Sequence, residues 1–215
     1  MKRIWNKKER VAANFMNINL NFKDIRMLKY LLSDDVWIKK LQKIREVFDF
    51  YSSVDVLLFE SVKEVSIYLG LEIPEWVVGT YFDKTIIMLD YEIWKNKGVG
   101  TFGQILLHEF VHVVITKITK NRCPVWLNEG IAMYFAEQQV NIFKKTNEDF
   151  YCENIFELTY DNEELYFISA ITVDRLIKVY GIETILFRIK NVSNYKEDYI
   201  LGVDNIKRIS YQYCI

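Results

Sequence analysis

Residues 101–134 read TFGQILLHEFVHVVITKITKNRCPVWLNEGIAMY, and they contain both histidines of the chain, His108 and His112. The two are four residues apart and Glu109 follows the first, which gives the pattern H-E-x-x-H. In a helix, residues at i and i+4 lie on one face, so both imidazoles would point to the same place. Such a pair can bind one metal ion, and Glu109 would then reach a water on that ion without being a ligand. The alternative is two core histidines that bond to backbone carbonyls, with Glu109 exposed.

The residues around the histidines predict a buried helix. Thr101 and Gln104 form a T-x-x-Q capping box, so the helix is expected to begin near Phe102. Apolar side chains then surround the histidines on nearly every side, as is typical of a central helix. They are Ile105, Leu106, Phe110, Val111, Val113, Val114 and Ile115.

A third ligand is expected from the second half of this stretch, because a catalytic zinc ion has three protein ligands and one water. Glu129 is the stronger candidate, since WLNEGIAMY is predicted to form a helix after Pro124 and Gly130 permits close approach of another backbone. Cys123 can also bind metal, but it precedes Pro124 in the predicted turn and has no second cysteine nearby. The expected packing residues of this helix are Trp126, Leu127, Ile131, Tyr134 and Phe135.

The two-part motif H-E-x-x-H and W-L-N-E-G-x-A resembles the gluzincin zinc metallopeptidases, and it is most similar to the bacterial peptidase MA-like family. The resemblance implies that His108, His112 and Glu129 bind Zn²⁺ and that Glu109 is the general base. It also implies a tyrosine that hydrogen-bonds the oxyanion, a role that we carry over to Tyr166. A packing role is the alternative for this tyrosine.

The resemblance further implies an α+β, zincin-like fold. A small mixed sheet with an edge strand over the cleft would be followed by a mainly helical half that carries the third ligand. We expect an N-terminal helical segment at residues 1–52 and a zincin-like metallopeptidase domain at residues 53–215, joined in one compact unit.

Hydrophobic periodicity and turn residues predict the other elements. At most one short helix is expected before residue 34. Pro74 and Gly79 favour an extended approach and a turn before a strand at Thr85–Leu89, which is either a sheet edge that binds an extended peptide or an ordinary core strand. A further helix is predicted from Asp34 or Asp35, with Trp37, Leu41, Ile44, Phe48 and Tyr51 on one face. The remaining predicted elements are a strand at Val54–Phe59 and helices at Glu60–Leu69, Leu165–Tyr180, Ile182–Ile189 and Asn205–Tyr213.

Composition bears on the protein's partners and on its compartment. The 28 Lys and Arg residues balance 29 Asp and Glu residues, which argues against nucleic acid as a partner. Cys123, Cys152 and Cys214 are widely spaced and odd in number, so we expect no disulfide framework and a reducing compartment, the cytoplasm. No apolar run is long enough for a signal peptide or a membrane span, although a secreted form trimmed of its signal peptide would look the same.

The expected activity is zinc-dependent hydrolysis of peptide bonds in a peptide or protein substrate. Aminopeptidases of this group carry a G-x-M-E-N type segment, and nothing between Val78 and Tyr91 matches it, so an endopeptidase is favoured. Met133 stands where thermolysin-like proteins carry a carboxylate that orients a histidine. Two alternatives stay open, a zinc-containing binding or regulatory module without catalysis, and a hydrolase of a non-peptide amide or ester.

Overall fold

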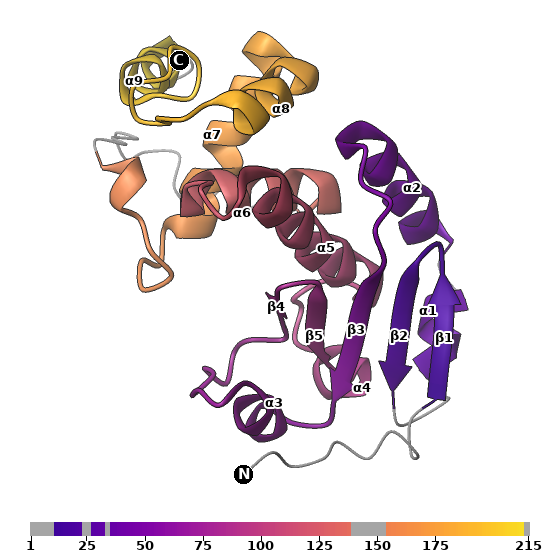
Figure 1. Ribbon diagram of the computed structural model, residues 1–215. Coiled ribbons are helices and arrows are strands. Elements are labelled where there is room, and N and C mark those ends of the chain that lie inside the picture. The colour runs from indigo at the N-terminus through magenta and orange to yellow at the C-terminus, as the bar shows by residue number, and fades with distance from the viewer. Residues whose placement is uncertain (1–10, 23–26, 33–34, 139–153, 213–215) are drawn as a thin grey trace. The chain divides into compact units, whose positions relative to one another are not determined.

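The computed structural model of the chain describes residues 11–22, 27–32, 35–138 and 154–212. The chain divides into two compact units, Met1–Val113 and Val114–Ile215. The first unit contains all the strands of the described residues, and the described part of the second is helical (Figure 1). Cys152 and Cys214 lie outside the described residues.

A five-stranded mixed sheet forms the centre of the first unit (Figure 1). Its order is β1-β2-β3-β5-β4, in which β2, β3 and β5 run parallel and the outer strands β1 and β4 are antiparallel to their neighbours. The strands are β1 (Val11–Phe15), β2 (Ile18–Phe22), β3 (Val54–Phe59), β4 (Gly79–Phe82) and β5 (Thr85–Leu89). Because β2 pairs with β3, the residues on both sides of position 52 belong to one sheet.

The strand at Thr85–Leu89 is central and not an edge, because β3 and β4 flank it and all of its residues after Thr85 are buried. The edge beside it is β4, where the sequence predicted a turn from Gly79. The turn instead comes at Asp83, whose φ of 52° lets the chain reverse directly into β5. Of the two alternatives left open for this strand, the core strand is therefore confirmed.

The hairpin of β1 and β2 was not predicted. Ile18, Leu20 and Phe22 are buried in alternation with half-buried asparagines, which is the pattern of a strand with one face on the core. Met16 and Asn17 connect the strands and both have positive φ, 49° and 65°. This geometry is that of a two-residue type I′ turn, which matches the twist of a hairpin.

Most predicted helices of the first unit are present, with small differences at their ends. They are α1 (Leu28–Leu32), α2 (Val36–Phe48), α3 (Val62–Leu69) and α5 (Phe102–Thr119), and a further short helix, α4 (Tyr91–Trp94), was not predicted. The predicted apolar face of α2 is buried, but Tyr51 lies beyond the helix and is 55% exposed. Helix α3 begins at Val62 and not at Glu60, because the Ser61 hydroxyl caps it by accepting a hydrogen bond from the Glu64 N–H.

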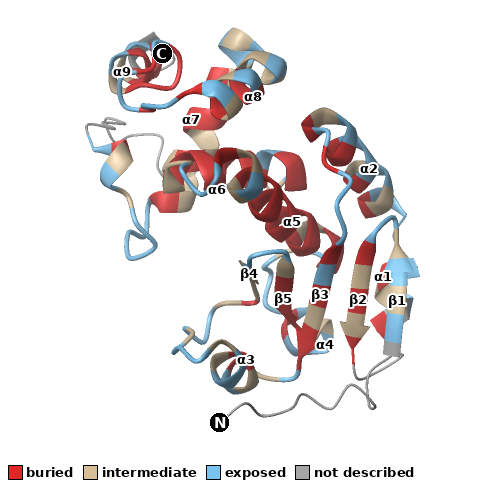
Figure 2. Cartoon of the chain, in the orientation of Figure 1, coloured by how far each residue is buried: buried red, intermediate tan, exposed pale blue. Residues whose placement is uncertain are grey.

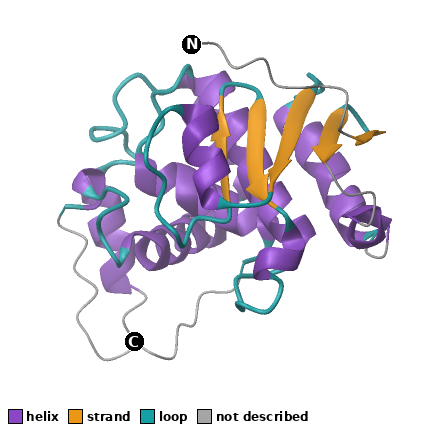
Figure 3. Ribbon diagram, turned by 90° about the horizontal axis from the view of Figure 1, so that it is seen from below, coloured by secondary structure: helices purple, strands orange, loops and turns teal. Residues whose placement is uncertain are grey.

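Helices α3 and α5 cover opposite faces of the sheet at β4. A Cβ atom on Gly79 would lie 3.0 Å from Cγ2 of Ile105 on α5. The next residue, Thr80, lines a small apolar cavity together with Val62 and Val65 of α3. Successive residues of a strand point to opposite faces, so β4 is held between the two helices. Figure 3 shows the strands side by side.

A buried arginine joins α2 to the segment before β3. Arg45 is 2% exposed, and its Nη1 donates hydrogen bonds to the carbonyls of Phe50 (2.8 Å) and Ser52 (3.2 Å). Its guanidinium also lies 4.9 Å from the ring centroid of Phe110 on α5. Burial lowers the pKa of Arg45 from its ordinary value. The carbonyls and the ring therefore offset only part of the free-energy cost of removing the charged guanidinium from water.

The second unit contains α6 (Val125–Ala136), a short 3-10 helix (Ile155–Glu157), α7 (Leu165–Tyr180), α8 (Ile182–Asn191) and α9 (Val203–Gln212). The close approach expected at Gly130 is confirmed, because a Cβ there would lie 2.4 Å from the Ser169 carbonyl oxygen and from Cγ2 of Val173. Helix α7 therefore packs backbone to backbone against α6. Tyr134, predicted to pack, is 41% exposed. Figure 2 shows that the rest of α6 is largely buried.

The chain is thus a mixed α/β protein, with a small mixed sheet in its first part and helices in the part that carries Glu129.

Candidate metal centre

The helix that carries both histidines begins where the capping box predicts. The Thr101 N–H donates to Oε1 of Gln104 (3.0 Å), and the Gln104 N–H donates to Oγ1 of Thr101 (3.2 Å). These reciprocal bonds satisfy two of the amides that the first turn of a helix leaves without partners. Helix α5 then runs from Phe102 to Thr119, which confirms the predicted start.

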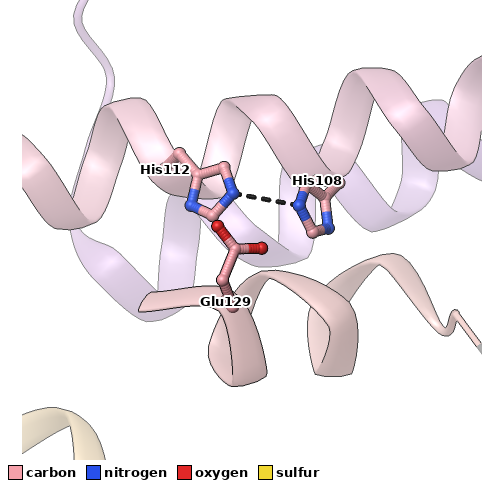
Figure 4. A group of neighbouring side chains, drawn as sticks. All are labelled: His108, His112 and Glu129. Carbon is pink, nitrogen blue, oxygen red and sulfur yellow. Dashed lines mark hydrogen bonds between the residues drawn. The ribbon is translucent and has the colours of Figure 1, made fainter. Parts of the chain in front are cut away.

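His108 and His112 lie on one face of α5 and are 8% and 3% exposed. Their Nε2 atoms are 2.9 Å apart, and their ring centroids are 4.5 Å apart with the planes at 89°. The ring nitrogens therefore point to one place, as Figure 4 shows. Two ligands on a tetrahedral ion with bonds of about 2.0 Å are about 3.3 Å apart, so the pair needs little rearrangement to bind a metal.

Glu129 approaches the two histidines from α6 (Figure 4). Pro124 begins this helix with its fixed φ of −58°, and Glu129 lies on its second turn with 2% exposure. One ligand atom from each of His108, His112 and Glu129 lies within 4.8 Å of the other two. The structure thus brings together the three residues predicted as ligands.

This donor set fits a divalent transition metal ion. Three atoms within 4.8 Å of one another all lie within about 2.8 Å of a common centre, and zinc bonds of about 2.0–2.2 Å require only small side-chain rotations. Two imidazoles with one carboxylate suit zinc and related ions of the first transition row. A buried carboxylate beside two buried imidazoles can therefore hold a metal ion, and the geometry does not select among these ions.

Glu109 follows His108 on α5 but is not in the ligand group. Its side chain is 7% exposed and is directed at the edge strand, because a Cβ on Gly79 would lie 2.9 Å from Oε1 and 3.1 Å from Cγ of Glu109. The alternative in which Glu109 is an exposed helix residue is therefore wrong. A buried carboxylate next to a potential metal ligand can exchange a proton with water in the site.

Two tyrosines that sequence reasoning missed contact the predicted ligands. The ring of Tyr81 on β4 stacks on the imidazole of His112, with centroids 5.3 Å apart and planes at 24°. The hydroxyl of Tyr160 donates a hydrogen bond to Oε1 of Glu129 at 2.9 Å. The alternation of β4 could have indicated Tyr81, which lies two residues after Gly79. No local pattern marks Tyr160.

Tyr166 and Cys123 are the two remaining residues that the sequence singled out. Tyr166 is the second residue of α7 and is half-buried, and its role in catalysis stays a prediction. Cys123 is outside the ligand group, and burial raises the pKa of its thiol, which keeps it protonated at neutral pH.

No protein-family profile, curated protein or solved structure matches this chain. In the part of the chain that the structure describes, no helix is both long and apolar enough to cross a membrane.

Proposed function

We propose that this protein is a zinc-dependent metallopeptidase of the gluzincin type, with Glu109 as its general base. The convergence of His108, His112 and Glu129 carries the proposal, because these three residues are buried and their ligand atoms lie close together. Catalytic zinc sites have three protein ligands, whereas structural zinc sites have four. Among the described residues the group has three, which favours a catalytic site.

Hydrolysis at this site needs a metal ion and a proton acceptor. A bound zinc ion would supply Lewis-acid activation of a water molecule and of the substrate carbonyl. The Glu109 carboxylate accepts a proton as the water oxygen bonds to the carbonyl carbon, and it then delivers that proton to the amide nitrogen as the C–N bond breaks. One water is consumed, and the products are a carboxylic acid and an amine.

The position of β4 supports a zincin-like arrangement and a peptide substrate. This strand is at the end of the sheet, and its Gly79 is in contact with the general base. An extended peptide that adds to β4 as a further strand would lie beside Glu109, with chain continuing in both directions. We therefore infer cleavage within a peptide and not at its amino terminus.

The test is a metal assay combined with a cleavage screen. The full chain is purified, its zinc content is measured by mass spectrometry, and a mixture of peptides of about ten residues is incubated with it. We expect about one zinc per chain, internal cleavage, loss of cleavage with a chelator, and recovery when zinc is added back.

The same preparation tests the two alternatives. One zinc per chain without cleavage of any peptide, but with chelator-sensitive cleavage of small ester or non-peptide amide substrates, would replace the peptidase by another hydrolase. Zinc without any hydrolysis would favour a binding module. A chain that binds no zinc at micromolar concentration contradicts the proposal as a whole.

A further inference from the structure

We propose that Tyr81 and Tyr160 are positioning residues of the candidate metal centre, which hold His112 and Glu129 in the orientation that binds the ion. This inference rests on the proposed metal site but concerns two side chains that contribute none of its three ligands. Each of them contacts a different ligand through a different kind of interaction.

Tyr81 fixes the plane of the His112 ring. The lone pair of an imidazole nitrogen lies in the plane of the ring, so rotation of the ring turns that lone pair away from the ion. Stacking at 24° with a centroid distance of 5.3 Å opposes this rotation. Tyr81 is held by β4, whose register with β5 pairs it with Ile86, so the stacking surface belongs to a rigid element.

Tyr160 fixes the carboxylate of Glu129. Its hydroxyl donates to Oε1 at 2.9 Å, which favours one rotamer of the carboxylate. Hydrogen bonds from residues behind a ligand orient it and tune its affinity for metal, and their removal usually lowers metal affinity 10–100-fold. Tyr160 reaches Glu129 from 31 residues further along the chain, so no local sequence constraint produces this contact.

The exposure of Tyr160 favours a positioning role over a packing role. Tyr160 is 51% exposed, so its ring contributes little to a core. Loss of the hydroxyl alone should therefore lower the metal affinity and leave the packing of the core in place. Tyr81 is half-buried, and for this residue the conservative change to phenylalanine keeps the stacked ring.

The experiment measures zinc affinity by competition with a chromophoric chelator, and the absorption spectrum of the Co²⁺ form, on the full chain. The variants are Tyr160→Phe, Tyr81→Leu and Tyr81→Phe, with Tyr134→Phe as control, since Tyr134 is an exposed tyrosine on the same helix as Glu129. We expect Tyr160→Phe and Tyr81→Leu to weaken zinc binding about 10–100-fold and to change the cobalt spectrum. Tyr81→Phe should restore affinity, and Tyr134→Phe should match the wild type.

Each half of the proposal can fail separately. If Tyr160→Phe binds zinc as tightly as the wild type with the same cobalt spectrum, its hydroxyl does not position Glu129. If Tyr81→Leu binds zinc as tightly as the wild type, the stacking role is overturned. It is also overturned if Tyr81→Phe binds zinc as weakly as Tyr81→Leu. These readouts do not depend on peptide cleavage, so they hold even if the protein is not a peptidase. A wild type that binds neither ion overturns both the proposed function and this inference.

Discussion

Gly79 on β4 and Glu109 on α5 are so close that a Cβ atom on the glycine would lie 2.9 Å from Oε1 of the glutamate. Gly79→Ala should therefore displace the carboxylate, which is the movable partner. A general base that is misplaced by about 1 Å can cost on the order of 100-fold in rate. We expect a fall of this order in kcat/KM, with zinc affinity unchanged. The matched control is Thr80→Ala on the opposite face of the strand, and equal activity of the two variants would contradict the assignment.

Glu109→Gln removes the proposed proton acceptor while keeping the shape of the side chain. A general base contributes typically 10²- to 10⁴-fold to the rate, so turnover should fall by that factor. The variant should still bind zinc, because Glu109 is not in the ligand group. Steady-state kinetics and zinc content are measured on the same sample. Cleavage at the wild-type rate would show that another residue takes the proton.

His112→Ala removes one of the three proposed ligands. Zinc at 100 times its dissociation constant should raise the free energy of unfolding of the wild type by about 2.7 kcal/mol, and this gain should be lost in the variant. Thermal unfolding with and without zinc measures it, and each protein is compared with its own metal-free form because the imidazole also packs on Tyr81. An equal zinc-dependent rise in Tm for both proteins would exclude His112 as a ligand.

Gly130→Ala tests the contact between α6 and α7. An exposed Gly→Ala change inside a helix stabilises it by about 1 kcal/mol, whereas overpacking costs about 1–3 kcal/mol. Here the added Cβ would lie 2.4 Å from the Ser169 carbonyl oxygen and from Val173. We expect Gly130→Ala to lower the free energy of unfolding measured in urea. Adding Val173→Ala to the same chain should recover only part of this loss, because the clash with the Ser169 carbonyl remains. A more stable Gly130→Ala variant would contradict the packing.

Asp198 should make the second unit sensitive to acid. Burial alone would raise its pKa, but hydrogen bonds from Arg188 and from the N–H groups of Leu201 and Ile200 outweigh burial and lower the pKa below its ordinary value of 3.8. A carboxyl whose pKa is lower in the folded state stabilises the fold above the unfolded pKa, and this stabilisation is lost as the pH falls through the folded pKa. Unfolding of the wild type should therefore become easier below the ordinary pKa.

Asp198→Asn is the comparison for this prediction. The amide cannot titrate, so the variant should be less stable at neutral pH and lose less stability than the wild type between neutral pH and pH of about 3. Urea unfolding at several pH values measures both trends. If the free energies of unfolding of the two proteins fall in parallel as the pH is lowered, Asp198 is not the source of the acid sensitivity.

The parts of the site that the sequence predicts are those that depend on short-range chemistry. The capping box at Thr101 and Gln104 determines where α5 begins, and the spacing of His108 and His112 then determines that they share a face. Gly130 could be assigned a close contact because only glycine permits one. The partner in that contact, the Ser169 backbone, could not be named from the sequence.

The parts that the sequence did not predict depend on pairing over longer distances. The hairpin before residue 23 was missed although Ile18, Leu20 and Phe22 alternate with asparagines, because asparagine is depleted in strands and favours turns. The strand that became the sheet edge is only four residues long and contains Gly79, which is a turn signal in isolation. Tyr160 has no local signal, since only the folded chain brings it to Glu129.

Both imidazoles and the acid belong to one continuous helix–turn–helix stretch, α5 and α6, and the sheet provides none of the three. The entropy lost when a chain closes a loop grows with the logarithm of its length, so this short separation keeps the entropic cost of gathering the donors small. An ion could therefore be captured by the hairpin of helices early in folding, before strand β2 pairs with β3. A bound metal ion would then help to nucleate the fold.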